Sequence, residues 1–297
     1  MTTQEPDLMC DSSADLLGRV GTQLGARLRR VRPVGPGAAP TLIAVGHGSR
    51  DPRAAATLRL LLDRVRDLRP GLDVRLAHIE LDAPLLGDTL AGLAELAGPA
   101  ETFGPAGDAP GAVLVPLLFA RGYHVKHDLP AAVAAAPSLR ARIAEPLGPH
   151  PLLVEALADR LAEAGWTPED GRSAATGVVL ATAGSRDPES AAAVRRIAGR
   201  LGERLGGVPV VPAYASAAAP TVPEAVRALA ARGRHRIAVA SCFTAPGLFA
   251  ARAAAHAPWL AADPLGAHPA LARLVLHRYD EALRPAVSAA RRELAAI

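Results

Sequence analysis

Two histidines and a glutamate stand out among the residues that could do chemistry, because each follows a short apolar run. His47 lies between two glycines, Glu80 ends a run that begins near residue 73, and His124 follows a run that begins near residue 112. Two imidazoles and a carboxylate suit a divalent borderline metal such as Co²⁺, Fe²⁺, Ni²⁺ or Zn²⁺. A neutral imidazole can also accept a proton near pH 7. The set predicts handling of metal ions or protons, provided that the fold brings the three side chains together.

The stretch around His47 predicts a strand, a tight turn and a helix. The apolar run from Leu42 to Val45 is typical of a buried strand, Asp51 is a good N-cap, and Pro52 suits the first helical position. Apolar residues at helical spacing follow, at Ala54, Leu58, Leu61, Leu62 and Val65. Open α/β sheets bind ligands at the carboxyl ends of their strands, which is where His47 falls. A structural turn with an incidental histidine is the alternative.

Strands and helices alternate from residue 41 onward, and this alternation predicts an α/β fold with parallel sheets covered on both faces. Strands are expected near 41–46, 73–80, 112–118, 142–146, 177–182, 209–214, 236–242 and 259–262. Helices are expected near 52–68, 84–97, 126–136, 151–164, 188–205, 222–232, 247–255 and 269–283.

The chain divides into two similar domains and two appendages. Residues 1–40 are expected to be a tail with a weakly amphipathic helix and a flexible linker, and residues 286–297 a short C-terminal tail. The polar, turn-rich segment from Trp166 to Ser173 predicts the boundary between a first domain at 41–168 and a second at 173–285.

An internal duplication relates the two domains. Gly48-Ser-Arg-Asp-Pro52 recurs as Gly184-Ser-Arg-Asp-Pro188, and Ala83-Pro84 recurs as Ala219-Pro220. What both halves keep is best explained by structure, and what one half alone carries is a better candidate for chemistry. His150 and His268 occur in both halves, each before a proline at a helix start, so we interpret them as structural.

The three chemical residues belong to the first half alone. The paired positions that differ are His47 and Ala183, Glu80 and Ser216, and His124 and either Leu248 or Phe249. His78, two residues before Glu80, either assists the site or lies in the core, and its counterpart Tyr214 favours the core.

Composition argues against several other classes of function. Half of the residues are apolar and 21% are charged, with no apolar run long enough to span a membrane, so we expect a soluble, cytoplasmic protein. Aromatic residues make up only 3% and do not interleave with basic ones, so nucleic-acid binding is unsupported. Cys10 and Cys242 suggest neither a disulfide framework nor a zinc site.

The motifs resemble those of the sirohydrochlorin chelatases, the class II enzymes that insert cobalt or ferrous iron into sirohydrochlorin. The resemblance rests on Gly46-His-Gly-Ser-Arg-Asp-Pro52, on Glu80 with Ala83-Pro84, and on Gly122-Tyr-His-Val-Lys-His-Asp-Leu-Pro130. It covers residues 41–285 and corresponds to the long two-domain form, in which only the first half keeps the metal-site histidines. It implies two parallel-sheet domains related by approximate two-fold symmetry, with a tetrapyrrole in the cleft between them.

The resemblance also implies roles for individual residues. His47 and His124 would be the metal-handling and catalytic histidines, with Glu80 as a third catalytic group. The substrate is a polycarboxylate, so Ser49, Arg50, Arg121 and Lys126 are expected to bind it. Arg50 recurs as Arg186, which leaves a structural role equally open.

The resulting hypothesis is a lyase of siroheme or cobalamin biosynthesis that inserts Co²⁺ or Fe²⁺ into sirohydrochlorin. The metal is its substrate, and no prosthetic group is expected. The fused duplication supplies internally the two-fold arrangement of a dimer, so a monomer is possible. The alternative is a non-catalytic metal or tetrapyrrole binding protein of the same fold.

Overall fold

The computed structural model describes residues 39–97 and 110–284. Its first half contains a four-stranded parallel sheet in the order β2-β1-β3-β4. The strands are β1 (Thr41–Gly46), β2 (Val74–His78), β3 (Ala112–Pro116) and β4 (Ala141–Ile143). The helices are α2 (Pro52–Leu68), α3 (Leu86–Ala97), α4 (Leu129–Ala134) and α5 (Pro151–Glu163), with a π-helical turn at His124–Asp128 before α4.

The second half repeats this topology, with its strands in the order β6-β5-β7-β8. Its strands are β5 (Thr176–Thr182), β6 (Val210–Tyr214), β7 (Arg236–Ser241) and β8 (Leu260–Ala261). Its helices are α7 (Pro188–Arg204), α8 (Val222–Ala230), α9 (Leu248–Ala254) and α10 (Pro269–Leu283). The alternation read from the sequence therefore gave the correct fold class: two similar parallel-sheet halves.

Alternate residues of each central strand face two different hydrophobic cores, because successive side chains of a strand point to opposite faces. Leu42 and Ala44 of β1 pack in one large cluster that also contains Val178 and Leu180 of β5. The outer faces have separate cores, with α3 and α4 on the first sheet and α8 and α9 on the second. Both halves thus share a single inner core.

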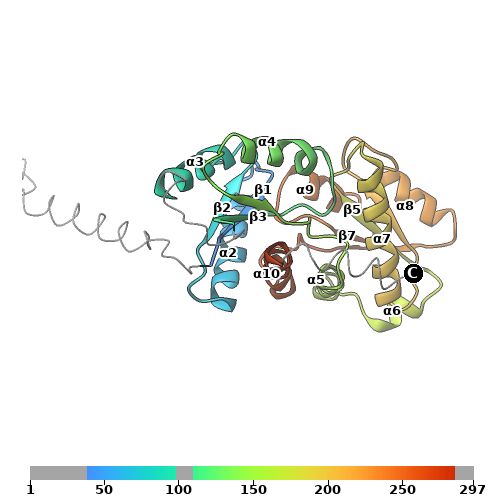
Figure 1. The fold of residues 1–297 in the computed structure, drawn as a ribbon. Helices are drawn as coiled ribbons and strands as arrows, with labels where there is room; N and C mark the ends of the chain where they lie inside the picture. The colour runs from blue at the N-terminus through green and yellow to red at the C-terminus, as the bar shows by residue number, and fades with distance from the viewer. Residues whose placement is uncertain (1–38, 98–109, 285–297) are drawn as a thin grey trace, which may run out of the picture. The chain divides into compact units, whose positions relative to one another are not determined.

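The two halves exchange their last helices across this shared core. α5 follows β4 in the first half but packs against β7 and α7 of the second, and α10 packs against β3 and α2 of the first (Figure 1). The guanidinium of Arg69 closes this exchange with two hydrogen bonds to Asp280, at 2.5 and 2.8 Å. Neither sheet is therefore complete without a helix from the other half, and the described residues 39–97 and 110–284 belong to one compact unit.

Two local features differ from the expectation. The turn-rich segment between the halves contains a short helix that the sequence does not predict, α6 (Pro168–Arg172). The Asp170 carboxylate accepts hydrogen bonds from the backbone N–H and the hydroxyl of Thr167, which gives this helix a capping box. The helix expected at 126–136 is a π-helical turn followed by α4.

The expected tails at 1–40 and 286–297 lie outside the described residues, apart from Ala39 and Pro40. The domain boundaries stay predictions. Within the described residues, no helix is long and apolar enough to cross a membrane.

Candidate metal and tetrapyrrole site

Backbone hydrogen bonding places His47 and Glu80 side by side at the carboxyl edge of the first sheet. β1 and β2 pair in register up to Gly46 and His78, and the Glu80 N–H then donates to the His47 carbonyl at 3.0 Å. Gly48 makes this approach possible. It has φ = 105°, and a Cβ there would lie 1.7 Å from the Glu80 carbonyl oxygen.

The side chains of His47 and Glu80 face each other across this turn. His47 Nε2 lies 3.3 Å from Glu80 Oε1, and both side chains are about half exposed. The pair is therefore accessible to a ligand from solvent. An imidazole beside a carboxylate can share the charge of a bound cation or pass on a proton.

His124 completes the group from the π-helical turn after β3. Its ring lies edge-on to that of His47, with centroids 4.7 Å apart and 86° between the ring planes. Its Nδ1 lies 2.5 Å from Asp128 Oδ2. π-helical turns of this kind often occur at functional sites. The structure thus brings His47, Glu80 and His124 together at one sheet edge, and their chemical roles stay a prediction.

The second half repeats the backbone around His47 and Glu80 without their side chains, and it has the α-helix α9 where the first half has the π-helical turn. The Ser216 N–H donates to the Ala183 carbonyl at 2.9 Å, as Glu80 does to His47. Gly184, like Gly48, has a positive φ. Strand pairing places Pro116 on Ser241, so His124 corresponds to Phe249, one of the two residues that the sequence had left open.

The turns of the two halves touch each other beside this site. A Cβ on Gly247 would lie 3.4 Å from Ser49 Oγ, and a Cβ on Gly122 would lie 3.3 Å from Ser185 Oγ. Leu248, which follows Gly247, is 61% exposed, and Tyr123, which follows Gly122, is 66% exposed. Large apolar side chains thus remain open to solvent where the halves meet.

The four residues expected to bind substrate lie in different environments. The Ser49 N–H donates to Asp82 Oδ2 at 3.0 Å, and the exposed Arg50 has no ion pair within the described residues. Arg121 pairs with Glu145 through Nε at 2.9 Å, and this contact raises the pKa of its guanidinium. The fourth, Lys126, bridges to the second half: its Nζ lies 2.5 Å from the carboxylate of Asp187 and 2.9 Å from that of Glu189.

Arg196 is a cation near the site that the sequence did not predict. Arg196 of α7 lines a cavity of about 410 Å³ together with Arg121, Glu145 and Glu189, and its side chain has no ion pair or hydrogen bond within the described residues. Arg196 is more than 70 residues from His124 in the chain, and its sequence context resembles that of any exposed helical arginine. No signal in the sequence would have selected it.

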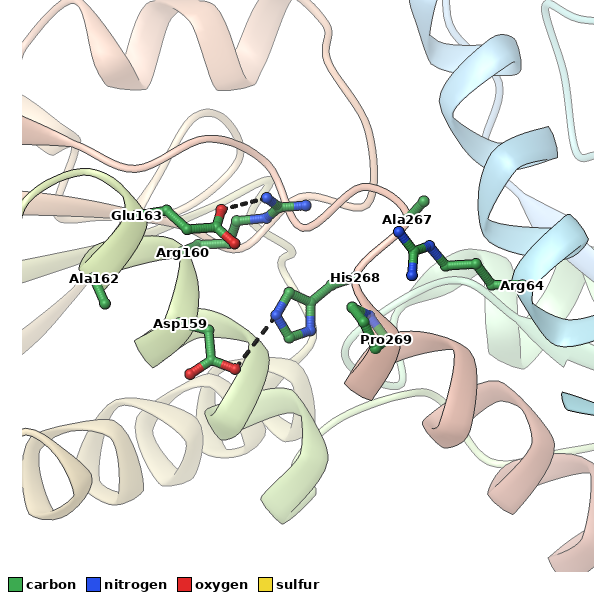
Figure 2. Close-up of a pocket in the computed structure, with 8 residues that line it drawn as sticks. All are labelled: Arg64, Asp159, Arg160, Ala162, Glu163, Ala267, His268 and Pro269. Carbon is green, nitrogen blue, oxygen red and sulfur yellow. Dashed lines mark hydrogen bonds and ion pairs between the residues drawn. The ribbon is translucent and has the colours of Figure 1, made fainter. Parts of the chain in front are cut away.

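A second cavity, of about 460 Å³, contains none of the predicted site residues (Figure 2). It lies where the end of α5 meets the start of α10. His268 Nε2 is 3.4 Å from Asp159 Oδ2, and His268 Nδ1 accepts from the Ala270 N–H at 3.2 Å. His268 is thus the N-cap of α10, and His150 caps α5 in the same way by accepting from the Leu152 N–H at 3.1 Å. Both histidines have the structural role that the duplication indicated.

Burial limits what His78 and Cys242 can do. His78 is fully buried next to Gly46, and neither ring nitrogen has a hydrogen-bond partner, so burial lowers its pKa. It cannot touch a ligand at the surface, which supports the core position. Cys242 is also buried, and burial raises its thiol pKa to about 12. Across residues 39–97 and 110–284, no three His, Cys, Asp or Glu side chains are arranged to enclose a metal ion.

Comparison with known proteins gives one family. The family model described as CbiX matches residues 41–164 and 177–282. A curated relative, the sirohydrochlorin ferrochelatase of Bacillus subtilis (strain 168), is 32% identical over 115 residues. That alignment covers 37% of this chain and 42% of the relative, so it spans less than half of either protein.

Solved structures match over a larger part of the chain. SirB from Bacillus subtilis with Fe³⁺ has a TM-score of 0.64 at 23% identity, covering 82% of this chain and 96% of that one. SirB from Bacillus subtilis subspecies spizizenii in complex with cobalt has a TM-score of 0.61 at 21% identity, covering 82% and 95%. CbiX, described as the terminal enzyme for biosynthesis of siroheme in denitrifying bacteria, has a TM-score of 0.58 at 22% identity, covering 82% and 100%. At these identities the likeness shows a shared fold.

Proposed function

Because the chain belongs to the CbiX family, we propose that it is a sirohydrochlorin chelatase, a lyase that inserts Co²⁺ or Fe²⁺ into sirohydrochlorin. One observation carries the proposal: His47, Glu80 and His124 meet at one sheet edge of the first half, while the second half repeats the topology and has none of the three. The names of the relatives agree with it, since they describe sirohydrochlorin ferrochelatase and SirB with iron or cobalt.

The reaction requires groups that accept protons and groups that hold a divalent metal. The macrocycle loses two pyrrole N–H protons as the ion enters. We assign proton acceptance to His47, which can transfer the first proton to the Glu80 carboxylate 3.3 Å from its Nε2 and then accept the second. The adjacent imidazole of His124 supplies a nitrogen ligand for the incoming ion.

The surroundings of the three residues suit an amphiphilic macrocycle with carboxylate substituents. Exposed apolar side chains of Tyr123 and Leu248 can pack against its flat face. Arg50 and Arg196, which have no ion pair in the described structure, can bind its carboxylates. Arg121 and Lys126 would have to release their present partners before binding substrate.

Steady-state insertion kinetics test the proposal. The protein should insert Co²⁺ or Fe²⁺ into sirohydrochlorin over many turnovers, and the His47→Ala, His124→Ala double variant should lose that activity while keeping its fold. Full activity in the double variant would refute the site. Stoichiometric binding of metal or tetrapyrrole without turnover would instead support the alternative of a binding protein. Running the assay with each metal separately identifies which ion is the better substrate.

A further inference from the structure

We propose that Asp128 is a positioning residue that holds His124 in one tautomer, with Nδ1 protonated and Nε2 directed to the substrate. The role of Nε2 toward the substrate rests on the proposed function, whereas the tautomer of His124 can be measured without any substrate.

The short contact between the two side chains determines where the ring proton lies. Asp128 Oδ2 is 2.5 Å from His124 Nδ1. An ionised carboxylate can only accept hydrogen bonds, so the proton of a neutral imidazole must be on Nδ1. Nε2 then carries the lone pair and has no hydrogen-bond partner within the described residues. That is the atom free to bind a metal ion or accept a proton.

The Asp128 carboxylate has no competing structural task. Asp128 lies at the N-cap position of α4, where an aspartate usually accepts a backbone N–H. Here its side chain makes no capping hydrogen bond, and the first orphan N–H, that of Leu129, bonds to the His124 carbonyl across the π-helical turn. The carboxylate is thus directed to the ring and not to the helix.

The second half lacks both members of the pair. With Gly122 placed on Gly247, His124 corresponds to Phe249 and Asp128 corresponds to Ala253. Ala253 lies within α9 and has no cap position to fill, so the comparison concerns the pair of side chains alone: the second half has neither the imidazole nor the carboxylate. An aspartate that occurs only beside the histidine is better explained by serving it.

Losing the carboxylate should therefore affect the ring more than the fold. The neutral ring would then populate both tautomers. It could also flip by rotation about χ2, which has a broad two-fold preference. Outer partners of this kind typically contribute about 10- to 100-fold in metal affinity or activity.

Nitrogen NMR of the full-length protein, labelled with ¹⁵N in its histidine rings, gives the direct test. The wild-type neutral ring of His124 should be in the Nδ1–H form. Asp128→Ala should produce a mixture of tautomers, and Asp128→Asn should retain most of the Nδ1–H form through its amide oxygen. Asp88→Ala is the matched control, because Asp88 is an exposed aspartate in the first turn of α3. A wild-type ring in the Nε2–H form, or an unchanged ring in Asp128→Ala, would overturn the proposal.

Cobalt titration connects the tautomer to metal handling. Asp128→Ala should weaken Co²⁺ binding about 10- to 100-fold in the wild-type background and have no further effect in a His124→Ala background. An equal loss in both backgrounds would mean that Asp128 acts without His124, which contradicts the proposal. If the NMR result holds and the wild type inserts no metal into sirohydrochlorin, the proposed function fails while the positioning role stands. If Asp128→Ala does not fold, the wild-type ring still decides: an Nε2–H form of His124 would overturn the proposal, and an Nδ1–H form that is retained in Asp128→Asn would support it.

Discussion

The imidazole of His47 meets that of His124 edge-on, with ring centroids 4.7 Å apart. In the proposed function both rings act on the same incoming ion, so removing either should disable the pair. We expect His47→Ala and His124→Ala each to lower kcat/KM for metal insertion by about 10²- to 10⁴-fold, and the double variant to lose little more. Steady-state kinetics on all four proteins measure this coupling.

The matched control for that cycle is His127→Ala. His127 is on the same π-helical turn but is exposed, and its ring lies on Tyr123 at a centroid distance of 4.6 Å. Activity near that of the wild type is expected. Losses that simply multiply in the double variant would show that the two rings work independently.

Gly48 and Gly184 offer a paired test of backbone geometry. A Cβ would lie 1.7 Å from the Glu80 carbonyl oxygen at Gly48 and 2.0 Å from that of Ser216 at Gly184. Alanine should lower the thermal midpoint at both positions, because each also has a positive φ. Only Gly48→Ala should also lower kcat in protein that remains folded, since it displaces Glu80. Equal effects on kcat would refute the placement of Glu80 in the site.

Lys126, the only lysine in the chain, joins the π-helical turn to the start of α7 through Asp187 and Glu189. Lys126→Met should lower the thermal midpoint, and the loss should shrink at high salt because exposed ion pairs are screened. Arg252→Met is the control, since Arg252 is exposed and forms no ion pair among the described residues. A loss that does not change with salt would point to packing of the side-chain stem.

Stability should fall in mild acid because His150 is held neutral. Burial, followed by the nearby charges of Arg278 and His277, lowers its pKa to about 4. Between pH about 6.5 and about 4, the unfolded chain therefore binds more protons than the folded chain. The contribution of neutral His150 to the free energy of unfolding is complete above pH about 6.5 and is lost as the pH falls to about 4. Asparagine also caps helices, so His150→Asn should flatten thermal midpoints measured across this range. An unchanged pH profile in that variant would contradict the assignment to His150.

The sequence predicted the helices and strands better than it predicted which of them pack together. The apolar runs of β1 and β5 and the helical stripe of α2 each carry a clear period, and the structure confirms them. The π-helical turn at His124–Asp128 has no such period, because it differs from an α-helix only in its backbone hydrogen bonds. Periodicity also cannot tell which sheet a helix covers, so the exchange of α5 and α10 was not predicted.

Contacts between the halves limited the prediction of the site in the same way. The loss of three residues from one half pointed to His47, Glu80 and His124, and they do converge. The carboxylates that hold Lys126 belong to α7, which is distant in sequence, and so does Arg196. Only tertiary structure reveals such neighbours.

The exchange of α5 and α10 has a consequence for how this duplicated chain can change. The first sheet is covered by a helix encoded at the far end of the chain, and β7 by one encoded in the middle. A deletion that removed the second half would also remove α10, which covers the inner face of the first sheet. The second half can therefore lose its chemistry, as Ala183, Ser216 and Phe249 indicate, but it cannot be discarded. The fold therefore gives a reason for its retention that does not depend on any histidine.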